Sequence, residues 1–79
     1  MVVLGHDISQ EVIDRAVLSF PPERSFRFMD MTSALVRSGV PHEVSDRCAD
    51  RVLQQLRKAG THTFSGGLWR RRKITAAAE

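Results

Sequence analysis

The chain has 79 residues and a mass of 8.9 kDa, the size of one small domain, which excludes a catalytic cleft between two lobes. Hydrophobic residues make up 42% and charged residues 27%, a balance typical of folded globular proteins. The formal net charge is +3, and it is unevenly spread. Residues 37–79 carry nine bases and four acids, whereas residues 1–36 carry three bases and five acids. This asymmetry predicts a polyanionic partner that contacts the second half of the chain.

Cysteine and histidine usage argues against a disulfide or metal site. Cys48 is the only cysteine, so neither an intrachain disulfide nor a cysteine cage for zinc can form. The three histidines, at 6, 42 and 62, match no metal-binding spacing. The apolar run at residues 1–4 is far too short to span a bilayer. We expect a cytoplasmic protein with no metal, no cofactor and no membrane association.

The first predicted helix runs from about Ser9 to Phe20. Its apolar residues recur at steps of three and four and fall on one helical arc: Ile8, Val12, Ile13, Ala16, Val17 and Phe20. Asp7 or Ser9 can cap the first turn by accepting backbone N–H bonds. The prolines at 21 and 22 end the helix, because they have no N–H group and disfavour helix in the residue before them.

The next segment admits two interpretations. Residues 24–28 form either a very short strand that buries Phe26 and Phe28 or an early start to the following helix. That helix is predicted to begin after Asp30 as N-cap and to end at Gly39 in a left-handed conformation. The apolar side chains around its start are assigned to the core: Phe26, Phe28, Met29 and Met31.

The longest predicted helix starts after Val40, with Pro41 at its first helical position, and ends at Gly60. One arc is apolar and consists of Val44, Cys48, Val52, Leu53, Leu56 and Ala59. The opposite arc is polar and consists of Glu43, Asp46, Arg47, Asp50, Arg51, Gln54, Arg57 and Lys58. Cys48 is thus predicted to be an inert core thiol.

A β-hairpin is predicted at the end of the domain. Gly66 and Gly67 separate β-favouring segments and can supply the positive φ angles of a tight turn. This turn pairs Ser65 with Leu68 and places Phe64 opposite Trp69, which packs the hairpin against the body. Residues 1–73 then form the domain, and residues 74–79 are predicted to be a disordered tail.

The order helix, optional strand, helix, tight turn, long helix and glycine-tipped hairpin resembles the winged-helix branch of the helix-turn-helix superfamily. The resemblance covers about residues 8–73. It rests on three sequence segments: Leu35-Val36-Arg37-Ser38-Gly39-Val40, Val52-Leu53-Gln54-Gln55-Leu56-Arg57-Lys58-Ala59-Gly60 and Phe64-Ser65-Gly66-Gly67-Leu68-Trp69. It implies a mainly α fold with a three-helix core and a β-hairpin wing. It also implies that the third helix lies in the major groove of double-stranded DNA while the wing contacts the backbone. Residues 39–60 leave about one helical turn more than many small winged helices have.

The candidate binding residues combine phosphate-binding cations with polar groups that can read base edges. They are His42, Ser45, Arg47, Arg51, Gln54, Lys58, Thr63, Ser65, Arg70, Arg71, Arg72 and Lys73. In an extended strand, Arg70 and Arg72 face one way, and Arg71 and Lys73 face the other. Double-stranded DNA bound by a small transcriptional regulator is the leading hypothesis.

Three carboxylates, on Glu43, Asp46 and Asp50, share the outer face of the third helix and repel phosphates. They also allow ordinary helical ion pairs, Glu43 with Arg47 and Arg47 with Asp50. Two alternatives therefore stay open: a winged helix that binds a protein partner, and RNA binding through the wing. A homodimer is also possible. The sequence has no phosphate-binding glycine loop, nucleophile elbow or paired catalytic carboxylates, so we do not expect an enzyme.

Overall fold

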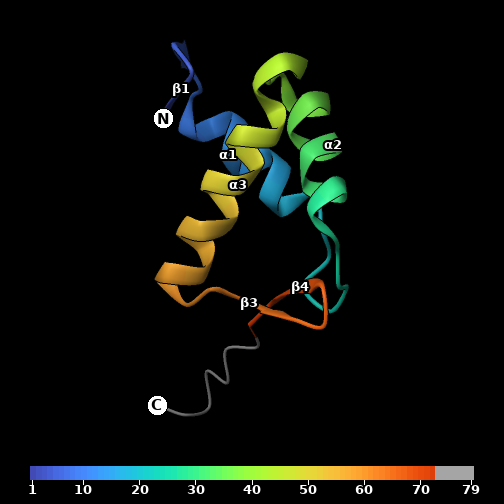
Figure 1. Ribbon diagram of the computed structural model, residues 1–79. Helices are drawn as coiled ribbons and strands as arrows, with labels where there is room; N and C mark the ends of the chain where they lie inside the picture. The colour runs from blue at the N-terminus through green and yellow to red at the C-terminus, as the bar shows by residue number, and fades with distance from the viewer. Residues whose placement is uncertain (73–79) are drawn as a thin grey trace.

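The computed structural model describes residues 1–72, which form a mostly helical domain with two small antiparallel strand pairs (Figure 1). The elements in chain order are β1 (Val2–Val3), β2 (His6–Asp7), α1 (Gln10–Leu18), α2 (Phe28–Ser38), α3 (His42–Ala59), β3 (His62–Ser65) and β4 (Leu68–Arg71). The three predicted helices and the C-terminal hairpin are therefore present. Lys73 and the predicted tail at residues 74–79 lie outside the described residues.

The N-terminal strand pair was not predicted from the sequence. Val2 pairs with Asp7 and Val3 with His6, across a turn in which Leu4 and Gly5 have φ angles of 49° and 83°. Val3 is fully buried, so this small hairpin contributes to the core. Because Asp7 lies in β2, it does not cap α1. Ser9 is the N-cap instead, and its Oγ accepts a hydrogen bond from the N–H of Val12 at 3.3 Å.

Helix α2 begins three residues earlier than the sequence indicated, at Phe28. Arg27 is its N-cap, and the N–H of Arg27 donates to Asp30 Oδ2 at 2.9 Å, so the prediction of Asp30 as N-cap was wrong. Phe28 belongs to the helix. Met29 is 68% exposed, which corrects its assignment to the core. The predicted left-handed end at Gly39 is confirmed, with φ 117°.

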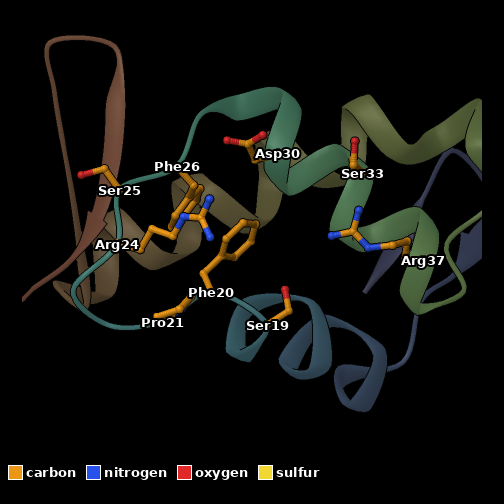
Figure 2. Close-up of a pocket in the computed structure, with 9 residues that line it drawn as sticks. All are labelled: Ser19, Phe20, Pro21, Arg24, Ser25, Phe26, Asp30, Ser33 and Arg37. Carbon is orange, nitrogen blue, oxygen red and sulfur yellow. The ribbon is translucent and has the colours of Figure 1, made fainter.

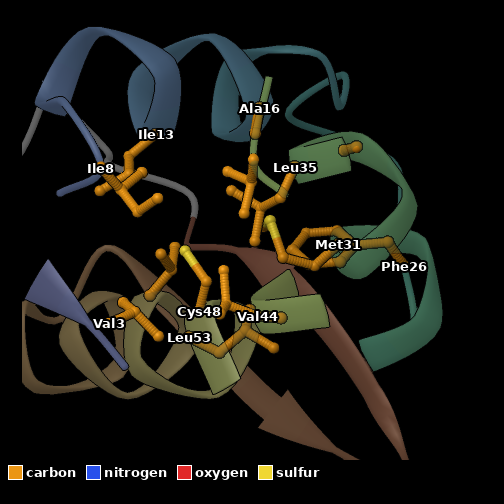
Figure 3. Close-up of a cluster of buried hydrophobic side chains, with 14 of the residues drawn as sticks. Val3, Ile8, Ile13, Ala16, Phe26, Met31, Leu35, Val44, Cys48 and Leu53 are labelled. Carbon is orange, nitrogen blue, oxygen red and sulfur yellow. The ribbon is translucent and has the colours of Figure 1, made fainter. Parts of the chain in front are cut away.

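The core lies where α1, α2 and α3 meet, with β1 and β4 closing its edges (Figure 3). Its largest fully buried side chains are Met31, Leu35, Leu53, Val3, Val52, Cys48 and Ser45. Helix α3 has 18 residues, with Pro41 as N-cap and Gly60 as left-handed C-cap at φ 79°. The additional turn between residues 39 and 60 is therefore helical. Within residues 1–72, no helix combines the length and the apolar character needed to cross a membrane.

The C-terminal hairpin has the predicted register. Ser65 pairs with Leu68 and Phe64 with Trp69, and the turn at residues 66–67 has φ angles of 60° and 79°. Trp69 is 5% exposed, and its ring centroid lies 4.9 Å from that of Phe64. Phe26 forms an antiparallel bridge to Trp69, with N–H···O distances of 2.8 and 2.7 Å. The loop before α2 therefore extends the hairpin sheet by one isolated bridge, formed by Phe26 beside β4.

Candidate nucleic-acid interface

The two faces of the C-terminal hairpin differ in burial. Side chains directly opposite each other in an antiparallel pair point to the same side, so one face carries His62, Phe64, Trp69 and Arg71. His62 and Trp69 on this inner face are each only 5% exposed. The other face carries Thr63, Ser65, Leu68 and Arg70, all of which are exposed. The second face is therefore the more exposed of the two, although Phe64 on the first face is also 49% exposed.

The three described arginines of the basic run have different surroundings, as the predicted alternation requires. Arg71 is partly buried on the inner face, where its Nη2 donates to the backbone oxygen of Phe20 at 3.3 Å. Arg70 is exposed, and its Nε donates to Ser25 Oγ at 3.3 Å. The exposed Arg72 has its Nη1 3.7 Å from the position that a Cβ on Gly60 would occupy. Arg70 and Arg72 are therefore suited to bind phosphates, whereas Arg71 fastens β4 to the body.

The bridge between Phe26 and Trp69 brings two further polar residues to the exposed face. Ser25 lies beside Arg70, as their hydrogen bond shows, and the backbone of Arg27 is extended, with φ −102° and ψ 168°. Arg27 is therefore placed next to Leu68 along the edge of the sheet. We call the resulting surface the outer hairpin face. It consists of Ser25, Arg27, Thr61, Thr63, Ser65, Leu68, Arg70 and Arg72.

The outer hairpin face combines three guanidinium groups with four hydroxyl groups and contains no carboxylate. Hydroxyls and guanidiniums are the groups that most often bind phosphate oxygens in protein–DNA complexes. Ser25 and Arg27 were not predicted as contact residues, because they lie in the acidic half of the chain. Only the tertiary pairing of Phe26 with Trp69 places them beside the basic run. A segment this short has no sequence pattern from which such a pairing could be predicted.

The exposed side of α3 has a mixed charge. It carries the cations Arg47, Arg51, Arg57 and Lys58, the amides Gln54 and Gln55, and the carboxylates of Glu43, Asp46 and Asp50, all exposed. Within residues 1–72, the ion pairs within 4.0 Å are Met1 with Asp7 and Glu11 with Arg15. The predicted pairs of Arg47 with Glu43 and with Asp50 are therefore not formed. Among these cations, Arg47, Arg57 and Lys58 have no ion-pair partner within 4.0 Å in residues 1–72 and are able to interact with a ligand.

Two predicted contact residues on α3 have structural partners. Ser45 is 1% exposed, and its hydroxyl donates to the backbone oxygen of His42 at 2.8 Å. Ser45 is therefore withdrawn from the contact surface, because it lies on the arc that packs against the rest of the core. Arg51 is exposed, but its Nη1 donates to the backbone oxygen of Val2 at 2.8 Å, which ties α3 to the N-terminal hairpin. His42 lies at a groove of about 520 Å³ between α2 and α3, next to Asp46.

The two cationic regions meet at the C-terminal end of α3. The hairpin leaves α3 at Gly60 and runs under the start of α2 (Figure 1). Arg72 lies over Gly60, one turn from Arg57 and Lys58, which line an open groove of about 440 Å³ with Gln54 and Gln55. Arg47 is about 16 Å farther along the helix axis than Lys58, at 1.5 Å per residue. The junction of the two regions therefore involves the last turns of α3.

Two buried titratable groups lie below this surface. Burial raises the pKa of the Cys48 thiol above 9.0, which outweighs the smaller lowering effects of the N-terminal amine and Arg51. Cys48 is fully buried, so it has the features of an inert core thiol. Burial, and secondarily Arg71, lowers the pKa of His62 below 6.5. Within residues 1–72, no three His, Cys, Asp or Glu side chains converge in a group that could hold a metal ion.

Comparisons of the chain with family models, curated proteins and solved structures gave no match.

Proposed function

We propose that this chain is a winged-helix domain that binds double-stranded DNA, with α3 as the recognition helix and the C-terminal hairpin as the wing. The order of elements supports the winged-helix interpretation. A helix, a bridging residue, two further helices and a hairpin follow one another, and the bridging residue, Phe26, pairs with the second strand of the hairpin. The left-handed Gly39 between α2 and α3 provides the tight turn of the helix-turn-helix unit.

The composition of the outer hairpin face is the observation that carries the proposal. Arg27, Arg70 and Arg72 are exposed there among hydroxyl groups, with no carboxylate on the same face. When such a surface binds a phosphate backbone, the counterions condensed on the phosphates are released, which favours binding. Arg57 and Lys58 extend the cationic surface onto α3, where Gln54 and Arg47 are able to bond to base edges.

Nucleic acid accounts for this surface better than a protein partner does. The outer hairpin face has only one large apolar residue, Leu68, which is 40% exposed. The centres of protein–protein interfaces are usually depleted of charge and rich in apolar and aromatic side chains. RNA differs from DNA by a 2′-hydroxyl and by groove shape, so the test has to compare the two directly.

Fluorescence polarisation with a labelled random duplex, titrated at several salt concentrations, tests the proposal. We expect salt-sensitive binding, with unlabelled duplex DNA competing better than duplex RNA or single strands. The double variant Arg70→Ala/Arg72→Ala should weaken binding to every sequence and reduce the salt slope by about 2. The single variants Arg70→Ala and Arg72→Ala are compared with Arg15→Ala, which removes one arginine, paired with Glu11 on α1, and should bind normally.

Absence of salt-sensitive duplex binding, together with a stable co-purifying protein, would instead favour the adaptor alternative. Stronger competition by RNA would favour RNA binding through the wing. An equal loss of affinity in the Arg15→Ala control would mean that net charge alone, and not the outer hairpin face, drives the interaction.

A further inference from the structure

A second basic groove borders the outer hairpin face, with which it shares Ser25, and its α2 residues Ser33 and Arg37 also line the groove between α2 and α3. This second groove has a volume of about 320 Å³ and is lined by the end of α1, the loop after it and the outer side of α2 (Figure 2). Arg24 comes from the loop and Arg37 from the last turn of α2. Figure 2 shows both side chains turned toward the space over the Phe20 ring, with Asp30 and Ser33 on the α2 side of the groove.

The two guanidinium groups have no internal partner in the described part of the chain. Neither takes part in an ion pair within 4.0 Å or in a side-chain hydrogen bond among residues 1–72, and the hydroxyl of Ser33 also forms none there. A guanidinium presents two parallel N–H groups that match the oxygens of a phosphate. Arg24, Arg37 and Ser33 therefore offer donors for one anionic group bound between the loop and α2.

The first turn of α2 offers an acceptor. Asp30 Oδ2 already accepts a hydrogen bond from the N–H of Arg27. The carboxylate has further acceptor capacity, so it is able to accept a hydrogen bond from a hydroxyl group of a ligand. The base of the groove is held in place by the Phe20 and Phe26 rings, which stack with centroids 4.2 Å apart and an interplanar angle of 18°. A ligand with both a phosphate and a hydroxyl group fits this distribution of donors and acceptors.

We propose that this groove is a binding site for a small phosphate monoester that also carries hydroxyl groups, with the phosphate between Arg24 and Arg37 and a hydroxyl group at Asp30. The loop that lines the groove is bonded to β4 at three points: Phe20 to Arg71, Ser25 to Arg70, and Phe26 to Trp69. A ligand in the groove therefore stabilises the loop that completes the hairpin sheet. Apart from Ser25, the residues that line the groove are not among those proposed to bind nucleic acid.

Nuclear magnetic resonance titration of the whole chain tests this site, with inorganic phosphate and adenosine monophosphate as probes at constant ionic strength. We expect saturable shifts centred on Phe20, Ser33 and Arg37, with adenosine monophosphate binding more tightly than inorganic phosphate. The variant Arg24→Gln/Arg37→Gln should weaken both by roughly tenfold or more. The matched variant Arg47→Gln/Arg57→Gln removes the same charge from α3 and should leave this binding intact.

Three results would overturn the proposal. Shifts that spread over all arginines without saturating would indicate counterion binding only. Equal losses in the two double variants would indicate a general charge effect. Loss of duplex binding in Arg24→Gln/Arg37→Gln, with neither small probe binding to the unaltered chain, would assign the groove to the DNA backbone contact. Circular dichroism of each variant checks the fold, and Ser33→Ala provides a second, uncharged substitution that should weaken phosphate binding severalfold.

Discussion

The exposed side of α3 and the outer hairpin face both carry arginines, but they differ in what surrounds the positive charge. On α3, three carboxylates are interspersed with four cations. On the outer hairpin face, the neighbouring side chains are mostly hydroxyls, and a nearby carboxylate, on Asp30, accepts the N–H of Arg27. A polyanion is attracted to the hairpin throughout, whereas along α3 attraction and repulsion alternate over a few ångströms. Under the proposed function, we expect the hairpin to provide affinity and α3 to restrict where and on which sequence the domain binds.

The hairpin can provide affinity only while it is fixed to the body, so breaking that attachment should have the largest effect. Trp69→Ala removes a side chain that is 95% buried and that packs on Phe64. We expect the free energy of unfolding to fall by about 3–5 kcal/mol, measured by urea denaturation. The neighbouring Leu68→Ala, on the exposed face, should change it by only about 0.5 kcal/mol. Similar losses in the two variants would contradict the assignment of inner and outer faces.

The adjacent Arg70 and Arg71 are expected to have different roles, Arg70 in binding and Arg71 in stability. Arg71→Ala should lower the free energy of unfolding by about 1–2 kcal/mol, because it removes a partly buried bond to the Phe20 backbone and the packing of the side chain. Its duplex affinity, measured below the melting range, should stay near that of the unaltered chain. Arg70→Ala should show the reverse pattern, with normal urea stability and weaker binding. Two variants that lose affinity equally would place Arg71 on the binding surface.

The carboxylates of α3 allow a test in the opposite direction. Asp46→Asn/Asp50→Asn removes two unpaired negative charges from the exposed side of α3. We expect about three- to tenfold tighter binding to random duplex at 0.1 M salt, since repulsion of nearby phosphates is removed. Glu11→Gln/Asp14→Asn makes the same charge change on α1 and should have a smaller effect. Unchanged affinity in the α3 variant would mean that DNA does not approach this side of the helix.

The smallest expected effect concerns pH. His62 has a lowered pKa because it is buried beneath the hairpin next to Arg71. The folded state thus favours the neutral imidazole, and this contribution to stability is present at neutral pH and is lost as the pH falls below about 6.5. His62→Gln should abolish this part of the pH dependence of the melting temperature. An unchanged pH profile in that variant would assign the acid sensitivity to other groups.

Helix positions and hairpin register were accessible from the sequence because each depends on local patterns. Helix α3 has a sustained apolar arc between Pro41 and Gly60, and the two glycines at 66–67 fix which residues pair across the turn. The N-terminal strand pair was missed because two residues per strand give too little alternation to detect. The exposure of Met29 was missed because it depends on which side of α2 faces α3, and that is a tertiary property.

The candidate site was only partly predictable for the same reason. The basic run at residues 70–72 is visible in the sequence, and alternation along a strand separates Arg71 from its neighbours. The burial of Ser45 follows from the packing of α3 against the core, and the bond from Arg51 to Val2 joins residues 49 positions apart. Arg27 joins the outer hairpin face only because Phe26 pairs with Trp69. Long-range pairings of single residues leave no periodic trace in a sequence.

The reciprocal bonds between the backbones of Phe26 and Trp69 have a consequence for the kinetics of local opening. Both amide protons are protected by the same bridge between Phe26 and Trp69. A fluctuation that lifts the hairpin therefore exposes both to solvent in the same event. Their hydrogen–deuterium exchange rates should rise and fall together across variants and conditions. The exchange of these two amides therefore reports whether the C-terminal hairpin moves together with the helices.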